Sequence, residues 1–315
     1  LTWLKKLLGL TADGKECGCL LLGLLGISAD LSFKRLRAFL KLAELCLSTD
    51  RPDQSWFEPS KLEKLRNLLP GLKRDYETYT STRAHLLTSY QEAFLSSEAE
   101  LQAIEQDLRK AQRSRLRCLS IRYHRRRNQV KKLRYDRRYP STILHDLEIA
   151  LHLKGLESRL ENQSETDKEL LGAWYRGYET DFAGVDRASE VARKLLASVR
   201  CRPLPEPLVR QASYGSAPSV QLQMTSNRLG ELLRSWQVHS STLEGLPSAG
   251  ALVARVGEIA EWNFDKLRSW LTVVINRLDS VRSCFERVEA SLRSQQAIPL
   301  SRLLRDLVSV DELHT

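Results

Sequence analysis

The sequence has little glycine and proline, 15 and 10 of its 315 residues, and runs of β-branched residues with period-two alternation are almost absent. Leucine, alanine, glutamate and arginine are abundant instead. A strand-rich protein needs that alternation and frequent turn residues, so the composition is typical of a chain made mostly of helices. The length exceeds that of a usual single core and favours two or more cores.

The motifs of the common enzyme classes are also missing. Gly14-Lys15 is followed by Glu16, where a nucleotide-binding phosphate loop needs Ser or Thr, and the upstream glycine of such a loop is absent. No G-x-G-x-x-G or G-x-S-x-G string occurs, and the six histidines do not cluster as metal ligands. We therefore expect no cofactor, no metal, no small-molecule substrate and no catalysis by this chain itself.

Neither a membrane span nor a disulfide framework is indicated. The most apolar window, Cys17 to Ile27, is shorter than the about 20 residues that cross a bilayer, and predicts a buried short helix. Of the six cysteines only Cys17 and Cys19 are close, so we expect free thiols in a reducing compartment and a cytoplasmic location. The chain starts at Leu1 without a signal-peptide pattern, and we expect a processed, trimmed or excised protein.

Two long segments carry apolar residues at the alternating three- and four-residue spacing of a coiled coil. The first, Leu62–Ala111, contains Pro70-Gly71, which predicts a kink, and a four-residue step from Tyr90 to Phe94, which we interpret as a stutter. The second, Ala260–Leu292, keeps the spacing without a miss. We predict a continuous helix over each segment, buried along its stripe.

The predicted fold is all-α, with an elongated antiparallel coiled-coil arm and a helical bundle. We expect a subdomain of short helices over residues 1–54, in which Thr11-Ala-Asp-Gly14 is a turn, and the long arm over 55–200. Residues 201–220 hold four of the ten prolines and predict a linker. The remainder, 221–315, is expected to form the bundle around the second long helix.

Basic residues are concentrated in one stretch, residues 109–139. It holds eleven arginines, three lysines and a single acid, Asp136, so its net charge is +13, whereas the whole chain carries +10. A thin apolar stripe through the stretch predicts that it is helical too. Such a density of cations favours contact with DNA or RNA phosphates, and the tyrosines Tyr123, Tyr135 and Tyr139 could stack on bases. Pairing with an acidic protein surface, or plain solvation, is the alternative.

The candidate nucleic-acid-binding residues are the cations of this stretch, namely Arg113, Arg115, Arg117, Arg122, Arg125, Arg126, Arg127, Lys131 and Lys132. No base-reading motif accompanies them, so weak sequence specificity is expected. Replacing Arg125, Arg126 and Arg127 with Glu is predicted to weaken binding with little change in stability.

Two shorter strings have a functional and a structural interpretation. His145-Asp146 has the composition of a metal phosphohydrolase motif but lacks its partner residues, and a helix start explains it equally well. The string from Trp174 to Phe182 is either an aromatic platform for bases or a tight corner between two helices, with Gly177 at the bend. Apolar helical stripes on both sides favour the corner.

The order of the landmarks resembles a known arrangement. The opening Trp56-Phe-Glu-Pro59 and the coiled-coil stripe precede Arg115-Leu-Arg117 and Tyr123-His-Arg-Arg126, and then come Asp146-Leu-Glu-Ile-Ala150 and the string Leu171–Phe182. This resembles the helical insertion of large bacterial Upf-like superfamily 1 helicases, often linked with defence against foreign DNA. It extends over about residues 30–200 and, more loosely, 220–313.

The resemblance implies a coiled-coil arm that projects from a nucleic-acid motor whose catalytic motifs lie outside this chain. We therefore expect a non-catalytic accessory domain of a helicase-like ATPase, which contacts nucleic acid, the parent core or another protein through the basic stretch. A free-standing helical adapter that recruits protein partners through its heptads is the alternative.

Overall fold

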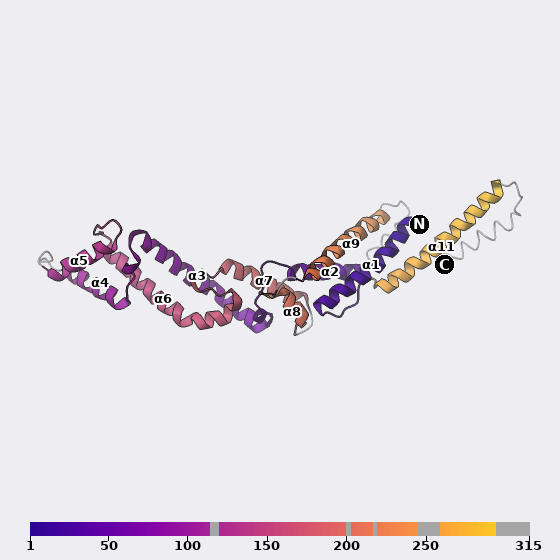
Figure 1. The fold of residues 1–315 in the computed structure, drawn as a ribbon. Helices are drawn as coiled ribbons and strands as arrows, with labels where there is room; N and C mark the ends of the chain where they lie inside the picture. Colours follow the sequence, from indigo (N-terminus) through magenta and orange to yellow (C-terminus); the bar gives the residue numbers. More distant parts are fainter. Residues whose placement is uncertain (114–119, 200–202, 217–218, 245–258, 294–315) are drawn as a thin grey trace. The chain divides into compact units, whose positions relative to one another are not determined.

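A computed structural model describes residues 1–113, 120–199, 203–216, 219–244 and 259–293 (Figure 1). Across these ranges every regular element is a helix, and an isolated antiparallel bridge joins Tyr90 to Arg134. The predicted all-α class is therefore confirmed. No helix in the same ranges combines the length and the apolar character needed to span a bilayer.

The chain folds into two compact units. Unit 1 combines Leu1–Thr49 with Ala197–Thr315, and unit 2 is Asp50–Leu196. This division differs from the predicted one, in which residues 1–54 and 221–315 were separate subdomains. The two segments share one unit because helices far apart in the sequence bury their apolar faces on one another.

Unit 1 is arranged around its first helix. Its described helices are α1 (Thr2–Leu25), α2 (Phe33–Cys46), α8 (Glu206–Ala212), α9 (Val220–Glu244) and α11 (Phe264–Arg293). Helix α1 packs against each of the other four. Phe33 stacks on Trp236 with 3.7 Å between ring centroids and meets Phe264 edge-on at 4.8 Å. These rings join α2, α9 and α11 in one core.

Helix α1 corrects two predictions. The string Thr11-Ala-Asp-Gly14, predicted as a turn, lies inside the helix, and the window Cys17–Ile27 supplies its second half rather than a short helix of its own. Gly14 serves close packing here, because a Cβ at this position would approach the Phe264 ring to 3.0 Å. The helix ends instead at Gly26, whose φ of 66° is the left-handed conformation common after helices.

Helix α8 corrects the predicted linker over residues 201–220. It occupies the middle of that stretch and packs on α1 and α2, with Leu208 and Ala212 buried. Pro207 lies in its first turn, where the missing N–H of proline costs no helical hydrogen bond. In this stretch a proline therefore lies at the start of a packed helix and does not indicate a linker.

Helix α11 starts four residues later than the predicted Ala260 and buries only the first part of its stripe. Phe264, Leu267 and Leu271 are buried, as is Ile275, which lies outside the predicted spacing. Leu278 and Phe285 are 43% and 63% exposed, so the prediction of a seam buried to Leu292 is wrong at these positions. Leu292 itself has no described side chain.

Unit 2 is built mainly from long helices. Its elements are η1 (Gln54–Phe57), α3 (Pro59–Ser89), η2 (Glu92–Phe94), α4 (Glu98–Arg113), α5 (Ile121–Leu133), α6 (Ile143–Leu171), η4 (Gly172–Trp174), η5 (Gly177–Glu179) and α7 (Phe182–Ser198), whose last residues belong to unit 1. Helix α6 packs against α3 and α4, and α5 packs against α4. Helix α3 runs through Pro70.

The predicted continuous helix over Leu62–Ala111 is wrong, because α3 ends at Ser89 and α4 begins at Glu98. Tyr90 leaves the helix with an extended backbone, and its buried ring stacks on Phe94 at 3.9 Å. The next amide, that of Gln91, donates to the carbonyl of Leu133 at 2.8 Å. Backbone pairing with the end of α5 and the residue after it therefore replaces continuation of the helix.

Three tyrosines hydrogen-bond to carboxylates of α6, and the pairs show that α3 and α6 are antiparallel. The hydroxyl of Tyr76 donates to Asp167 at 3.0 Å, and that of Tyr79 donates to Glu157 at 2.9 Å. Tyr90 donates to Asp146 at 2.6 Å. Burial and these carboxylates raise the pKa of all three phenols, so the protons stay on the tyrosines.

The string from Trp174 to Phe182 forms a corner between α6 and α7, and this part of the structural interpretation is confirmed. Gly172 and Gly177 have φ values of 58° and 59°, which glycine adopts without strain. Tyr178 stacks on Tyr79 with 4.3 Å between ring centroids, so an aromatic side chain fills the junction.

Candidate nucleic-acid interface

The described residues of the basic stretch form the last turn of α4, helix α5 and the loop that follows, and a few apolar side chains hold the two helices together. Helix α4 buries Leu101, Ile104, Leu108 and Ala111 at the three- and four-residue spacing of one helical face. Helix α5 contributes Val130, which is fully buried. The hydroxyl of Ser120 caps α5 by accepting a hydrogen bond from the Tyr123 amide at 3.3 Å. Most of the circumference of α5 is therefore left to polar and basic residues.

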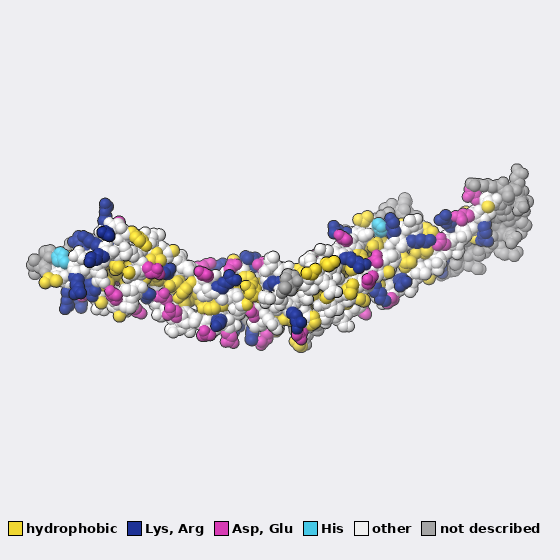
Figure 2. Space-filling model, in the orientation of Figure 1, with side chains coloured by type: hydrophobic (Ala, Val, Ile, Leu, Met, Phe, Trp, Pro, Cys, Tyr) yellow, Lys and Arg dark blue, Asp and Glu magenta, His cyan; other side chains and the backbone are white. Residues whose placement is uncertain are grey.

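The exposed cations define the candidate interface. Figure 2 shows Lys and Arg side chains gathered over α4, α5 and the loop that follows. The exposed cations of the two helices that make no ion pair with a described carboxylate are Lys110, Arg113, Arg122, Arg125 and Lys132. Because α5 turns through 100° per residue, Arg125 and Lys132 lie on one stripe and Arg122 lies beside it.

Arg126 is a structural residue rather than a free cation. Its Nε donates to Asp107 of α4 at 3.0 Å, and its Nη1 donates to Gln129 at 3.0 Å. The side chains of Arg126 and Asp107 are only 25% and 24% exposed. This ion pair joins α5 to α4, so Arg126 is less available to phosphates than its exposed neighbours, and its phosphate contact stays a prediction.

Arg127 and Lys131 are half-buried as well. The guanidinium carbon of Arg127 lies 5.1 Å from the centre of the Tyr139 ring, and its Nε is buried with no hydrogen-bond acceptor. A charge reversal at Arg127 would therefore disturb packing, and the prediction that the Arg125, Arg126 and Arg127 triple substitution leaves stability unchanged does not fit the contacts. The candidates Arg115 and Arg117 lie outside the described residues.

The other described arginines of the basic stretch also divide into ion-paired and unpaired side chains. Arg109 is paired with Glu105 at 2.7 Å and with Glu148, and the hydrogen bond to Glu105 raises the pKa of Arg109. Arg137 and Arg138 are exposed, and neither makes an ion pair within the described chain. Arg137 and Arg138 are not among the predicted nucleic-acid-binding residues. Their position in the basic stretch, after the predicted helix, is the sequence feature that could have indicated them.

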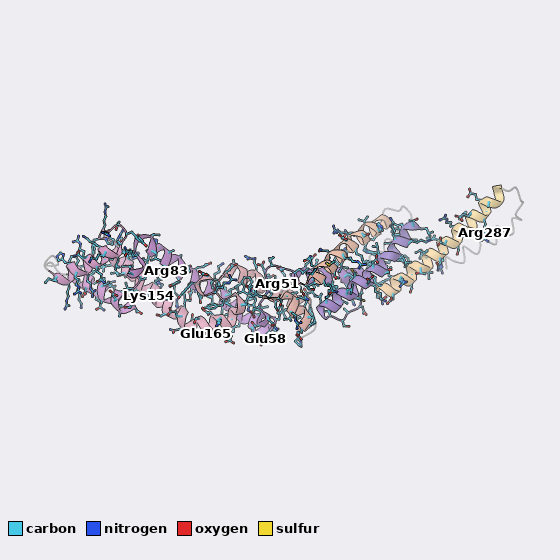
Figure 3. All side chains as sticks on the ribbon, viewed as in Figure 1. Arg51, Glu58, Arg83, Lys154, Glu165 and Arg287 are labelled. Atoms are coloured by element: carbon cyan, nitrogen blue, oxygen red, sulfur yellow. The ribbon has the colours of Figure 1, made fainter. Side chains whose placement is uncertain are left out.

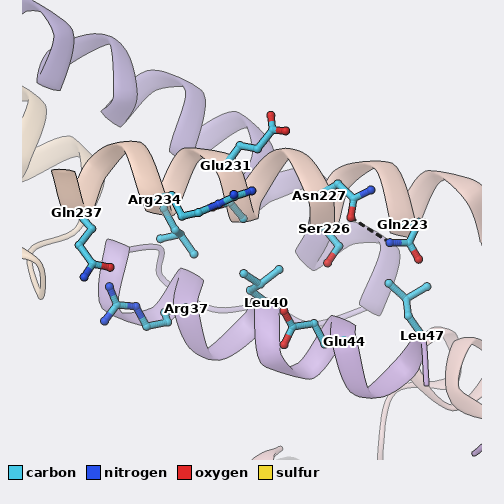
Figure 4. Close-up of a pocket in the computed structure, with 12 residues that line it drawn as sticks. Arg37, Leu40, Glu44, Leu47, Gln223, Ser226, Asn227, Glu231, Arg234 and Gln237 are labelled. Carbon is cyan, nitrogen blue, oxygen red and sulfur yellow. Dashed lines mark hydrogen bonds between the residues drawn. The ribbon is translucent and has the colours of Figure 1, made fainter. Parts of the chain in front are cut away.

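Three grooves in the described part of the chain do not gather a comparable set of unpaired charges of one sign. In unit 1 a groove of about 720 Å³ between α2 and α9 is lined by charges of both signs, among them Arg37, Glu44 and Arg234 (Figure 4). No histidine or cysteine lies among the described residues that line it.

Further grooves lie in the described part of unit 2. The first, of about 820 Å³, includes Arg83 and Lys154 (Figure 3). Arg83 is paired with Glu92, and Lys154 lies 2.6 Å from Glu157, so both cations are already neutralised. A ligand in this groove would have to compete with two formed ion pairs.

Three histidines, His85, His145 and His152, line the second groove of unit 2, about 540 Å³ in volume, between α3 and α6. Nothing in the sequence pattern indicated this proximity. Even so, no group of three ligating side chains in the described parts of the chain is arranged to hold a metal ion. Asp146, next to His145, accepts hydrogen bonds from Tyr90 and Thr142, which gives the His145-Asp146 string a structural role.

Comparison of the chain with protein-family models, curated proteins and solved structures finds no match in any of the three. The resemblance to the helicase insertion therefore stays a prediction, and the geometry of the basic residues is the basis for assigning a function.

Proposed function

We propose that this chain is a non-catalytic helical arm of a superfamily 1 helicase-like ATPase that binds DNA or RNA through phosphate contacts. The observation that carries the binding proposal is the group of exposed, unpaired cations on α4 and α5: Lys110, Arg113, Arg122, Arg125 and Lys132. A surface that served only as a helix-packing face would not need so many charges of one sign. The helicase assignment rests on the resemblance alone.

The binding mechanism follows from the charge of the phosphate backbone. Each phosphate that a lysine or arginine neutralises releases condensed counterions, so affinity falls steeply as salt rises. Arginine can also grip a phosphate with two parallel hydrogen bonds. Phosphates carry no sequence information, so unrelated sequences should bind with similar affinity. The catalytic motifs and their magnesium would belong to the parent ATPase.

The test is a charge reversal restricted to exposed, unpaired positions. We expect the Arg122→Glu, Arg125→Glu, Lys132→Glu variant to lose affinity for unrelated sequences alike. The slope of log affinity against log salt should fall by roughly 0.9 for each lost phosphate contact on duplex DNA. Fluorescence anisotropy over a salt series measures both quantities.

A matched control is available on α3, where Lys64, Arg66 and Arg74 are exposed and make no ion pair with a described carboxylate. Reversing these three changes the net charge by the same amount in the same unit, outside the basic stretch. Binding should stay close to that of the unmodified protein. An equal loss of affinity in the control variant would show that only net charge matters. If the unmodified protein shows no salt-dependent binding to nucleic acid, the proposal is wrong.

The second candidate function is a helical adapter that recruits a protein. The observation that favours it is on α11, where Leu278 and Phe285 of the predicted seam are exposed. The two functions are separated by the coding sequence around this chain, because a phosphate loop upstream would identify the helicase.

A further inference from the structure

The loop between α5 and α6 contains a turn fixed by hydrogen bonds (Figure 1). The Nε and Nη2 atoms of Arg134 donate to the two carboxylate oxygens of Asp136, at 2.9 and 3.0 Å. The same carboxylate accepts from the Arg138 amide at 3.0 Å, and these contacts lower the pKa of Asp136. The Arg137 amide donates to the Arg134 carbonyl at 3.3 Å, with Arg137 at a φ of 55°.

This turn is attached to the packed end of α3. The amide of Tyr135 donates to the carbonyl of Ser89 at 3.3 Å, and Arg134 lies 5.4 Å from the centre of the Tyr90 ring. Tyr90 is buried and held by Asp146. The backbone on both sides of Tyr135 is therefore held in place before any ligand binds.

Tyr135 differs from the other tyrosines of the basic stretch in its exposure. Tyr123 is half-buried and meets His124 edge-on, and Tyr139 is half-buried beneath Arg127. Tyr135 is 63% exposed. Of these three candidates for base stacking, Tyr135 therefore has a ring available to a ligand.

The neighbours of Tyr135 in the chain have the chemistry of a phosphate-binding site. Arg137 and Arg138 are exposed, and Asp136, the nearest acid in the sequence, is engaged by Arg134. An exposed ring beside cations is the combination by which proteins hold unpaired strands, since the ring stacks on a base and the cations contact the backbone. Bases inside a duplex are already stacked on one another and offer only their edges.

We propose that the turn from Arg134 to Arg138 is a binding site for single-stranded nucleic acid, in which one base stacks on Tyr135 while Arg137 and Arg138 contact adjacent phosphates. This inference rests on the proposed function and adds a preference for unpaired strands. Stacking on a base tolerates any sequence, because every base has a flat face.

The test compares Tyr135→Ala with the unmodified protein on a single-stranded oligonucleotide and on a blunt duplex of equal charge. We expect the substitution to weaken single-strand binding by about 5- to 150-fold, the effect of losing one stacked base. Duplex binding should stay unchanged. Tyr135→Phe should bind single strands like the unmodified protein, because the ring is retained.

Two controls make the outcome specific. Tyr214→Ala removes an exposed tyrosine of unit 1 and should leave binding intact. On an oligonucleotide of abasic sites, which keeps the phosphates but has no bases, Tyr135→Ala should have no effect. If Tyr135→Ala binds single strands normally while the salt-dependent binding persists, the stacking inference is wrong and the proposed function stands. If the unmodified protein binds no nucleic acid, both fail.

Discussion

Cations that look alike in the sequence have different roles, because each role depends on the residues that surround the side chain. Arg125 is exposed and makes no ion pair with a described carboxylate, whereas its neighbour Arg126 is held by Asp107. Three consecutive residues of a helix point in directions about 100° apart, so the three arginines cannot share one environment.

We expect Arg126→Ala to lower the free energy of unfolding by about 1 kcal/mol, since it leaves Asp107 half-buried without its partner. Arg125→Ala should change it by less than about 0.5 kcal/mol, as usual for an exposed position. Urea denaturation of the two variants measures the difference. Equal stabilities would show that the Asp107 contact contributes nothing.

Asp167 and Glu157 both accept a tyrosine hydrogen bond, but their pKa values move in opposite directions. Burial raises the pKa of Asp167, and the bond from Tyr76 opposes this without cancelling it. Burial also acts on Glu157, but the hydrogen bonds from Lys154 and Tyr79 outweigh it and lower its pKa. The folded state therefore binds the Asp167 proton more tightly, and the Glu157 proton less tightly, than the unfolded state does.

The pH dependence follows from these signs. As pH rises from the unfolded pKa of Asp167, about 4, through its folded pKa, ionised Asp167 costs stability. Asp167→Asn keeps an acceptor for Tyr76, so the variant should melt at or above the melting temperature of the unmodified protein at pH 7.

Glu157 contributes stability above its unfolded pKa, and this stability is lost as pH falls through its folded pKa. The Glu157→Gln variant should therefore melt at a lower temperature than the unmodified protein at pH 7. Thermal melts at pH 7 and near pH 4 test both, and the reverse order at pH 7 would contradict the assignment.

At the scale of the helix, several starts carry a signal in the local sequence. Ser32 caps α2 by accepting from the Arg35 amide at 3.2 Å, and Pro59 opens α3; serine and proline are residues that local chemistry favours at these positions. The break after Ser89 was missed because the apolar spacing continues through it. Ser97 and Glu100 have the spacing of a capping box, and Ser97 does accept from the Glu100 amide, so a local signal for the start of α4 was present.

Substitutions along α11 can test how much of its apolar stripe is packed in the core. Leu271 is buried where α11 packs on α1, and Leu271→Asp should cost about 3 kcal/mol or more by placing an unpaired charge in a packed seam. Leu278→Asp makes the same chemical change at a side chain that is 43% exposed, and should cost under about 1 kcal/mol. Thermal unfolding followed by circular dichroism compares the two. Equal melting temperatures would contradict the difference in burial between Leu271 and Leu278.

At the scale of the whole chain, helix content was predictable and the grouping of helices was not. Composition and periodicity are local properties, and they give the all-α class. The packing of α1 on α9 and α11 joins residues some 200 positions apart in the chain, and no local pattern encodes which helix meets which. The sequence predicts the exposed cations of α5 as candidate binding residues. The difference between Arg125 and Arg126 becomes visible only with the position of α4 in the structure.

The 315-residue chain should not bind ATP. Glu16 stands where a phosphate loop needs a hydroxyl ligand for magnesium, and Gly14-Lys15 lies inside α1 rather than in a loop whose amides could surround phosphates. Isothermal titration calorimetry with magnesium and ATP should give no saturable heat. Micromolar saturable binding would overturn this prediction and the non-catalytic assignment with it.

Sliding of α6 along α3 is restricted by the phenol–carboxylate pairs. A seam of leucines alone loses little when one helix shifts by a heptad, because leucine again meets leucine. Here a seven-residue shift would move each hydroxyl by about 10.5 Å from its acceptor. Tyr76 and Asp167 would then be buried polar groups without partners, which costs far more than the pair gains when it is correctly aligned. The pairs thus select one alignment of the two helices by penalising the others.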